Sequence, residues 1–497
     1  MNWELYTAGL PLILHLDVML MLLTGVISGV IIGALPGLTA NMAVAIMTPL
    51  TYGMGPTAAF GLLLGAYCGG VYGGSITAII AKIPGTPSAM MTTLDGYPMG
   101  QRGEAGKAIG IATVASCIGG MISVITLALF APVVANFALE FSAQEYFAIA
   151  VFGLSIIAYI SPSSMARGLL SGCIGMLFST IGTDPINGYA RFTFGNINLL
   201  TGLELLPVLI GTFGLAEALS VAEKPMDGSI EVNKQIGRIL PTWEDMKRIT
   251  PTMIRSSPIG TIVGAVPAAG GTIAAIVAYG IEKRFCKRAE LLGTGIPEGV
   301  ATPEAANNAS TGGAMIPMLT LGIPGDSITA ILIGAMLIHG LQPGPMLFQD
   351  NFDIVSAIFL LMALANILFL GVGLVGARVV GKIIQTPMGI LLPIIIFFCL
   401  VGTYAIRNEP FDLMIMVLFG VTGFILNKIN IPTAPLILGF ILSPIVESNL
   451  RRSLVLSNGD LTTLFTRPLS ATFLILTIVI LFYPQIHGVI KRATGRK

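Results

Sequence analysis

Two related stretches, Ile83-Pro84-Gly85-Thr86-Pro87-Ser88 and Gly322-Ile323-Pro324-Gly325-Asp326-Ser327, interrupt long apolar runs of this chain 240 residues apart. Each places a helix-breaking Pro-Gly pair in front of hydroxyl or carboxylate side chains. In a lipid bilayer every backbone N–H and C=O group needs a hydrogen-bond partner, so broken backbone survives there only when it is buried in protein or lines a polar cavity. We therefore predict that the two breaks belong to the functional site.

The composition identifies the class of protein. Of the 497 residues, 54% are hydrophobic and 10% are charged, whereas a soluble domain has about 25% charged residues. Apolar runs of spanning length predict roughly ten to fourteen membrane passes. The formal net charge of +1 offers no basic surface, so we expect no nucleic-acid partner. We predict an all-α integral membrane protein, a polytopic helical bundle in the lipid bilayer, and the bacterial cytoplasmic (inner) membrane is its simplest location.

A polar stretch divides the chain into two halves. We expect a first membrane repeat over residues 1–222, a cytoplasmic linker over 223–256 and a second membrane repeat over 257–497. The linker is rich in Lys and Arg, which the positive-inside rule places in the cytoplasm. Thr242 followed by Asp245 is typical of a capping pattern and predicts an amphipathic surface helix around 242–250. We interpret the stretch as a solvated linker between the halves, and a docking element is the alternative.

The halves repeat at the positions where helices would break. At a spacing of 231 residues, Gly29, Ile31, Gly33, Ala34, Pro36 and Ala43 correspond to Gly260, Ile262, Gly264, Ala265, Pro267 and Ala274. At a spacing of 240 residues, Ala66, Gly73, Ile76, Ile83, Pro84 and Gly85 correspond to Ala306, Gly313, Ile316, Ile323, Pro324 and Gly325. Paired Gly/Pro-interrupted segments in two halves indicate the binding site of a secondary transporter.

The charges that flank the first broken segment of each half predict how the repeats are oriented. Segment 257–281 has Arg255 before it and four basic residues shortly after it, so we expect a hairpin that enters from the cytoplasm and turns near Pro267. Segment 25–50 breaks over residues 33–37 and has no Lys or Arg at either end, as expected for entry from the opposite side. We therefore predict two inverted repeats with Pro-Gly-broken helices or re-entrant hairpins.

A helix that begins inside the membrane exposes unpaired N–H groups and the positive end of its dipole, which together favour an anion. Hydroxyl side chains near such a start add hydrogen-bond donors. The predicted substrate-binding residues are Gly37, Thr39, Gly85, Thr86, Ser88, Gly325 and Ser327. The first Pro-Gly break is the more favourable for an anion, because neutral residues follow it where the second break has Asp326 and Ser327.

Carbonyl, amide and hydroxyl oxygens near broken helices bind Na⁺. The predicted cation-binding residues are Asn41, Asn307, Asn308 and Asp326. Hydrogen bonding between helices is the alternative role for Asn307 and Asn308, and capping of the following helix is the alternative for Asp326. Lys82 either balances substrate charge or extends to an interface. His339 is a proton-relay candidate, although a packed or interfacial histidine is the commoner case.

The motifs of several enzyme classes are missing from the sequence. It has no G-x-S-G serine site, no H-E-x-x-H zinc pair and no Walker loop, and its five cysteines contain no C-x-x-C pair. We expect a protein that is not an enzyme, with no cofactor and no metal beyond Na⁺ as a coupling ion. Without an ATP site, transport would depend on an ion gradient. The first apolar run follows Glu4 without a basic region, so we expect no cleaved signal peptide.

Motifs in both halves resemble the TctA family, the large membrane subunit of tripartite tricarboxylate transporters. They are Gly33-Ala34-Leu35-Pro36-Gly37-Leu38, Tyr72-Gly73-Gly74-Ser75, Ile83-Pro84-Gly85-Thr86-Pro87, Asp95-Gly96-Tyr97-Pro98-Met99, Pro303-Glu304-Ala305-Ala306-Asn307-Asn308-Ala309 and Leu321-Gly322-Ile323-Pro324-Gly325. The resemblance runs through both halves in order. The chain departs from its own first-half pattern at Pro267-Ala268, where Pro36-Gly37 stands in the first half.

The resemblance implies a secondary active transporter that imports citrate, another tricarboxylate or a related carboxylate, by symport with Na⁺. It also implies two partners, a small TctB-like membrane subunit and a TctC-like periplasmic solute-binding protein that delivers the substrate. Two alternatives stay open from the residues alone. One is a proton-coupled carrier that acts without partners, and the other is a channel or membrane scaffold in which the breaks are packing kinks.

Overall fold

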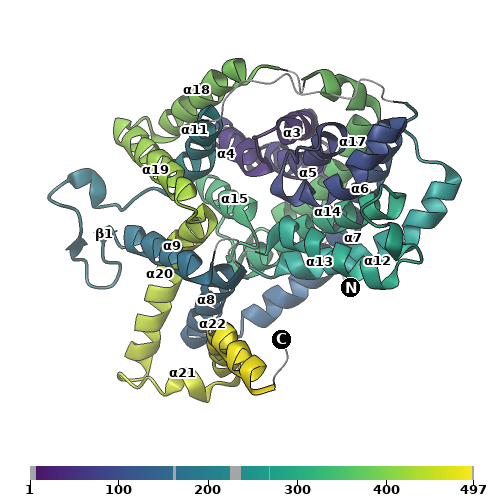
Figure 1. Ribbon diagram of the computed structural model, residues 1–497. Helices are drawn as coiled ribbons and strands as arrows, with labels where there is room; N and C mark the ends of the chain where they lie inside the picture. The colour runs from purple at the N-terminus through teal and green to yellow at the C-terminus, as the bar shows by residue number, and fades with distance from the viewer. Residues whose placement is uncertain (1–6, 161–163, 224–236, 268, 384–385, 495–497) are drawn as a thin grey trace. The chain divides into compact units, whose positions relative to one another are not determined.

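The computed structural model describes residues 7–160, 164–223, 237–267, 269–383 and 386–494 (Figure 1). Two predicted features lie partly outside these residues. They are the linker, of which residues 224–236 are not described, and the turn near Pro267, of which Ala268 is not described. The chain forms two compact units. The first comprises Met1–Asn136 and Leu206–Phe424, and the second comprises Phe137–Leu205 and Ile425–Lys497. The division into a first repeat, a linker and a second repeat stays a prediction.

The first unit contains helices from both predicted repeats. Its α-helices, three of which extend slightly past its bounds, are α2 (Leu10–Ile13), α3 (Leu16–Ala34), α4 (Ala40–Leu50), α5 (Pro56–Ala81), α6 (Thr92–Met99), α7 (Ala105–Ala138), α10 (Leu205–Leu209), α11 (Ala216–Ala222), α12 (Trp243–Ala265), α13 (Gly270–Phe285), α14 (Pro297–Leu321), α15 (Ser327–Ile338), α16 (Leu347–Asp350), α17 (Phe352–Ile383), α18 (Met388–Arg407) and α19 (Pro410–Lys428). Its 3₁₀ turns are η1 (Pro87–Met90) and η5 (Ala289–Leu291), and its π-helical segments are η2 (Gly100–Glu104) and η4 (Ile210–Leu215).

The second unit consists of α8 (Ala143–Ile160), α9 (Met165–Ser179), β1 (Gly182–Thr183), β2 (Ala190–Arg191), η3 (Ile197–Leu199), α20 (Thr433–Leu456), α21 (Thr463–Thr466) and α22 (Pro468–Thr494). Helix α20 packs against α8 and α9, and α22 packs against α8. The short strands pair antiparallel, with Gly182 opposite Arg191. Ion pairs from Arg191 and Arg451 to Asp184 and Glu447 fix this hairpin to α20.

Eight helical segments among the described residues are long and apolar enough to cross a membrane. They are Leu16–Ala34, Pro56–Ala81, Thr92–Ala138, Leu205–Ala222, Phe352–Gly376, Met388–Arg407, Pro410–Lys428 and Thr433–Leu456. Five shorter apolar helices, which are α4, α9, α15 and parts of α8 and α22, add to them. The prediction of an all-α polytopic membrane protein is confirmed.

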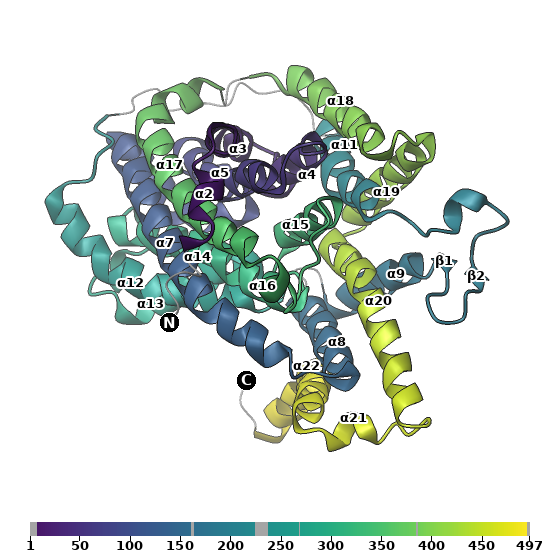
Figure 2. The ribbon, with the colours of Figure 1, turned by 180° about the vertical axis from the view of Figure 1, so that it is seen from behind.

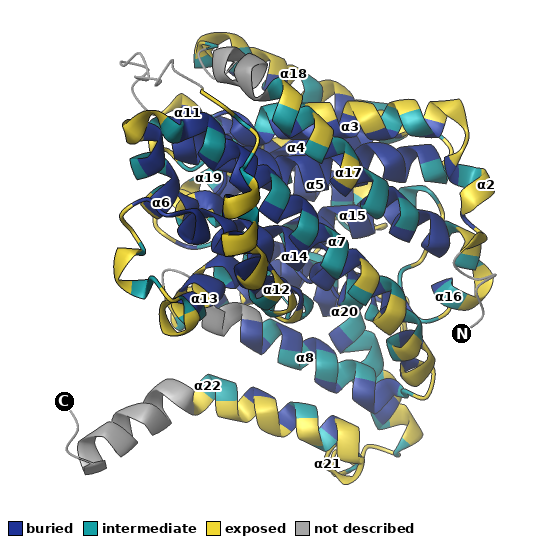
Figure 3. Cartoon of the chain, turned by 90° about the vertical axis from the view of Figure 1, so that its right-hand side faces the viewer, coloured by how far each residue is buried: buried dark blue, intermediate teal, exposed yellow. Residues whose placement is uncertain are grey.

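Two helices of the first unit, α5 and α14, are buried along almost their whole length, as the dark blue ribbons in Figure 3 show. Helix α5 is apolar and small-residue-rich, whereas α14 carries Glu298, Glu304, Asn307 and Asn308 in its buried length. A helix that is buried on all sides is expected to be apolar, because buried polar groups cost free energy unless they are paired. The polar content of α14 therefore points to the functional site.

Small residues let the long helices of each half approach closely. Helix α3 packs against α5 and α12 packs against α14, and in Figures 1 and 2 both pairs lie within the first unit. A Cβ atom on Gly29 would lie 2.6 Å from the carbonyl oxygen of Ala66, and one on Gly260 would lie 2.2 Å from that of Ala306. Only glycine permits these distances, which is the reason for Gly in such helix interfaces.

The same contact thus occurs in both halves at the spacings of 231 and 240 residues that were predicted for the repeat. Two more contacts repeat in the same way. Gly33 packs against the carbonyl of Gly70, and Gly264 packs in the same way against that of Ser310. Gly73 packs against the carbonyl of Val30, and Gly313 packs in the same way against that of Thr261. The α3–α5 and α12–α14 pairs are therefore built alike, residue for residue. That the two repeats are inverted in the membrane stays a prediction.

Helix α12 combines two segments that the sequence suggested separately. The capping box predicted at its start is present, because Thr242 Oγ1 accepts from the N–H of Asp245 at 3.2 Å and Asp245 Oδ2 accepts from the N–H of Thr242 at 3.0 Å. The helix does not stop near residue 250 but continues to Ala265, where the predicted break begins. Two internal prolines, Pro251 and Pro258, do not end it.

Candidate functional site

The chain breaks between paired helices in each half, as the sequence predicts. In the second half, α12 ends at Ala265 and α13 begins at Gly270. The Arg255 side chain, near the open end of this hairpin, binds Glu282 of α13 at 2.7 Å, and Thr252 donates to the same carboxylate. The two ends of the hairpin therefore lie side by side, and its predicted fold is confirmed. The side of the membrane from which it enters stays a prediction.

In the first half, α3 ends at Ala34 and α4 begins at Ala40. Gly37 turns the chain with φ of +85°, a conformation that costs little only for glycine. Thr39 caps α4, with its hydroxyl oxygen accepting from the N–H of Met42 at 3.3 Å. The position of this break is as predicted.

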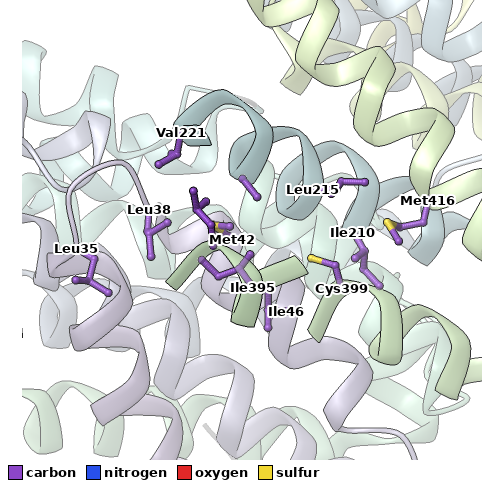
Figure 4. Close-up of a cluster of buried hydrophobic side chains, with 12 residues drawn as sticks. Leu35, Leu38, Met42, Ile46, Ile210, Leu215, Val221, Ile395, Cys399 and Met416 are labelled. Atoms are coloured by element: carbon purple, nitrogen blue, oxygen red, sulfur yellow. The ribbon is translucent and has the colours of Figure 1, made fainter. Parts of the chain in front are cut away.

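The surroundings of the first-half break are more apolar than expected. A Cβ atom on Gly37 would lie 3.1 Å from the Val221 side chain of α11. Figure 4 shows Leu35, Leu38 and Met42 in one buried cluster with side chains from η4, α11 and α18. Asn41, in the first turn of α4, is half-buried. This half of the predicted site therefore combines one capped helix start with a hydrophobic wall.

The Ile-Pro-Gly stretch of the first half folds back onto its own helix. Lys82 ends α5 with φ of +59°, and the N–H of Gly85 donates to the carbonyl of Gly74 at 3.2 Å. A Cβ atom on Gly85 would lie 2.2 Å from the carbonyl oxygen of Gly33. The Pro-Gly stretch thus meets the end of α3, so the two breaks of the first half lie against each other.

This first Pro-Gly break is not followed by the half-helix that the sequence suggested. Only the four-residue turn η1 follows Gly85 before α6 begins at Thr92. Thr86 caps no N–H group and instead pairs its hydroxyl with that of Ser88 at 3.1 Å. Thr86 is buried and Ser88 is half-buried. Lys82 is exposed, with Nζ 5.4 Å from the ring centroid of Tyr97.

The second Pro-Gly break is the expected half-helix start. Gly322 ends α14 with φ of +69°, and Gly325 packs so tightly that a Cβ atom there would lie 2.5 Å from the Cα atom of Ala314. Asp326 forms a capping box with Thr329, whose N–H donates to Asp326 Oδ1 at 2.7 Å. The Tyr67 hydroxyl of α5 donates to Asp326 Oδ2 at 2.6 Å. The capping role weighed for Asp326 is confirmed, and its role in cation binding stays a prediction.

The breaks interlock across the two repeats. Turn η1 of the first half packs against α13 and α14, and α15 of the second half packs against α4 and α5. In both rotated views, α15 lies beside α4 (Figures 1 and 2). The element after the Pro-Gly break, η1 in the first half and α15 in the second, therefore contacts two helices of the other repeat. One belongs to its broken hairpin (α13 or α4), and the other is its fully buried helix (α14 or α5).

The start of α13 brings several predicted residues together. A Cβ atom on Gly271 would lie 2.2 Å from Asn307 Oδ1 and 3.2 Å from Ser310 Oγ, and one on Gly270 would lie 3.6 Å from Asp326 Cβ. At the corresponding place in the first half, Gly70 faces Ala40. The second repeat thus has the Ser310 hydroxyl where the first repeat has Gly70.

The amide side chains of Asn307 and Asn308 are both about 99% buried, and each uses its nitrogen rather than its oxygen. Asn307 Nδ2 donates to the carbonyl of Val71 at 3.5 Å, and Asn308 Nδ2 donates to that of Glu304 at 3.4 Å. The Oδ1 atom of each is buried without a hydrogen-bond partner. Because an unpaired buried acceptor costs free energy, these two oxygens are candidate ligands for a cation.

Asp95, to which the sequence alone assigns no role, joins the two repeats. Its buried carboxylate accepts from the Tyr279 hydroxyl at 2.7 Å and from the N–H groups of Gly293, Gly295 and Ile296 at 2.8–3.0 Å. Arg102 donates to carbonyls of the same loop. Asp95 therefore fixes the loop that leads into α14. The signal was present in the sequence as a carboxylate next to the first break.

Glu304 is the second residue without an assigned role. It lies in the middle of α14 with no exposed surface. Thr92 Oγ1 donates to one carboxylate oxygen and Ser116 Oγ donates to the other at 2.9 Å. Among the described residues, no basic side chain forms an ion pair with it. A carboxylate in an apolar core with only hydroxyl partners is unusual, because buried charges are normally paired with opposite charge or bind metals.

Known proteins match this chain over most of its length. The family described as "Tripartite tricarboxylate transporter TctA family" matches residues 19–438. An uncharacterized 52.8 kDa protein in the TAR-I ttuC' 3' region of Agrobacterium vitis is 36% identical over 472 residues, which cover 93% of each chain. An uncharacterized protein in the TAR-II ttuC' 3' region of the same organism is 35% identical over 234 residues, which cover 46% of this chain and 96% of the relative. No solved structure matches the chain.

Proposed function

Because the chain belongs to the TctA family of tripartite tricarboxylate transporters, we propose that it is the large membrane subunit of a secondary transporter for a tricarboxylate or related carboxylate. In this proposal, Na⁺ drives import across the bacterial inner membrane. A periplasmic solute-binding protein (TctC-like) delivers the substrate, and a small membrane subunit (TctB-like) completes the complex. The observation that carries the proposal is the duplicated pair of broken helices whose post-break elements interlock.

Broken helices in corresponding places of two repeats support a carrier more than a scaffold. Broken backbone inside a membrane protein is kept where it serves a buried site, since each unpaired backbone group otherwise costs several kcal/mol. Here each repeat has two breaks, and each break is lined by glycines that permit backbone contact. Transporters with internal repeats bind substrate and ions where such breaks meet near the middle of the membrane.

The carboxylate is proposed to bind at helix starts. Helices α4, α13 and α15 begin at breaks, and their first N–H groups and dipoles favour negative charge. Hydroxyl donors stand near these starts or near the first Pro-Gly turn at Thr39, Thr86, Ser88 and Ser327. Gly37, Gly85 and Gly325 give the turns their shape. Since no regular helix follows Gly85, the proposed preference of an anion for that break rests on hydroxyl groups alone.

The coupling ion is proposed to bind beside α14 of the second repeat. The unpartnered oxygens of Asn307 and Asn308 support this placement, because hard oxygen ligands suit Na⁺. Asp326 and Asn41 remain candidates with less support, since both Asp326 oxygens already accept hydrogen bonds. The rival proposals are a proton-coupled carrier that acts without partners and a channel or scaffold.

Counterflow in proteoliposomes tests the carrier proposal. Vesicles that contain the purified chain and are loaded with unlabelled citrate are expected to accumulate labelled citrate transiently, and a panel of other di- and tricarboxylates identifies the substrate. A channel or a scaffold gives no stimulation by internal substrate. Replacing Na⁺ with choline at fixed pH is expected to abolish uptake. Uptake that continues in choline but follows a pH gradient would instead identify the proton-coupled carrier.

A further inference from the structure

We propose that Glu304 is the anionic ligand of a buried Na⁺ site that also uses the amide oxygens of Asn308 and Asn366 and the hydroxyl oxygens of Thr92 and Ser116. This inference rests on the proposed Na⁺ coupling and names its site. The five side chains come from α14, α17, α6 and α7, and all are buried.

The charge of Glu304 is the first argument. Its two oxygens accept from the Thr92 and Ser116 hydroxyls, which bring no positive charge. The matched case on the same helix is Glu298, which lies 3.7 Å from the Arg288 guanidinium. A buried ion costs several kcal/mol unless opposite charge compensates it. One bound Na⁺ would supply that charge at Glu304, and each hydroxyl oxygen, which donates its proton to the carboxylate, keeps lone pairs that can bind a cation.

The unpartnered amide oxygens are the second argument. Asn308 lies one helical turn after Glu304, and its nitrogen donates to the Glu304 carbonyl, which leaves Oδ1 without a partner. Residues four apart lie on the same face of a helix. The carboxylate and the free amide oxygen therefore occupy one face of α14.

A third oxygen comes from α17. The Asn366 nitrogen donates to the carbonyl of Met362, and its Oδ1 is also buried without a partner. This oxygen lies against α7, because a Cβ atom on Gly120 would be 1.7 Å from it. Gly120 follows Ser116 by one helical turn, so Asn366 Oδ1 and the Ser116 hydroxyl share a face of α7. The glycine leaves the space that this oxygen occupies.

Together these groups offer one carboxylate, two amide oxygens and two hydroxyl oxygens, which is a hard donor set of single negative charge. That set matches a monovalent cation with little affinity for nitrogen or sulfur. The site is also next to the breaks, because Asn307, which precedes Asn308, faces the start of α13. Binding of Na⁺ would thus fix the middle of α14 beside the proposed carboxylate site.

The test is direct binding of ²²Na⁺ to the purified full-length chain by scintillation proximity, with unlabelled Na⁺ as competitor and choline as the ionic control. Glu304→Gln is expected to weaken binding by more than roughly 100-fold, as for loss of one member of a buried charge pair. Glu298→Gln is the matched control and should bind as wild type does. Equal binding by Glu304→Gln and wild type would overturn the site while leaving Na⁺ coupling in place.

A second variant, Asn366→Leu, separates loss of Na⁺ binding from loss of folding. It keeps the number and branching of the side-chain heavy atoms and removes an unpaired polar group, so it should melt at the wild-type temperature or higher without Na⁺, yet bind ²²Na⁺ at least tenfold more weakly. Unchanged affinity in this variant would remove Asn366 from the site and overturn the proposal as stated. Absence of ²²Na⁺ binding to wild type, with carboxylate binding intact, would overturn both this site and Na⁺ coupling while leaving the carrier.

Discussion

Removal of the Asp95 carboxylate should destabilise the protein strongly, because four donors from the second repeat depend on it. Three of these donors are buried, namely the Tyr279 hydroxyl and the N–H groups of Gly295 and Ile296, whereas Gly293 is exposed and water can replace its bond. An unsatisfied buried donor costs about 1 kcal/mol or more. Asp95→Ala should therefore lower the free energy of unfolding by about 3 kcal/mol.

The measurement is equilibrium unfolding by sodium dodecyl sulfate in mixed micelles, followed by far-ultraviolet circular dichroism. Tyr279→Phe removes one of the three buried bonds and should cost about 1 kcal/mol. Glu104→Gln is the control, since the Glu104 side chain is 43% exposed and lies 3.7 Å from Arg102, and it should stay within about 0.5 kcal/mol of wild type. An Asp95→Ala protein that unfolds with the control would show that the loop before α14 does not depend on this carboxylate, and the reasoning would be wrong.

Three further predictions address the breaks and the second unit. Asn307→Ala should weaken Na⁺-dependent carboxylate binding, measured by thermal shift, by roughly tenfold at unchanged expression, and an unchanged Na⁺ response would remove Asn307 from the site. Gly85→Ala should lower the free energy of unfolding by about 2 kcal/mol, because its Cβ atom would lie 2.2 Å from a backbone carbonyl, whereas Gly280→Ala, which faces open space, should be neutral or slightly stabilising. Two backbone N–H groups of its own turn, with Arg451, lower the pKa of Asp184 from 3.8 to about 2. A pKa that is lower in the folded state stabilises the fold fully above about pH 4, and this stabilisation is lost as the pH falls toward 2. Pepsin should therefore cut the 182–191 hairpin faster at pH 2 than at pH 4, and Asp184→Asn should lessen that difference.

The duplicated packing makes the differences between the repeats informative. Lys82 and Gly322 both end a central helix in the left-handed conformation, and Thr86 and Asp326 both stand at the following helix start. Of these two residues, only Asp326 can cap the following helix with a charged side chain, and only the second break is followed by a half-helix, α15. The predicted asymmetry between the breaks is therefore real in structure. Its assignment to anion and cation binding is a separate matter, which the binding experiments decide.

Local sequence was sufficient for the breaks and for the repeat. Pro-Gly pairs interrupt helices wherever they occur, and glycines at matched spacings allow the same close backbone contacts in both halves, so Gly29 and Gly260 were identifiable from the printed chain. The same reasoning placed the capping box at Thr242, because the cap residues are neighbours in sequence. These features are local, and local physics determined them.

The partners of buried polar groups required the tertiary structure. Asp95 accepts hydrogen bonds from a loop about 200 residues away, and Glu304 accepts hydrogen bonds from hydroxyl groups of α6 and α7. Because the donors are distant in sequence, residues within one helical turn of either carboxylate do not predict these contacts. Likewise the Val221 side chain that packs against Gly37 belongs to α11, a helix distant in sequence. The sequence by itself determined a membrane protein with two sets of broken helices, since hydropathy and helix breaking are local properties. Only the tertiary structure decided which buried oxygens are left without a partner, because satisfying a polar group depends on every helix that packs around it.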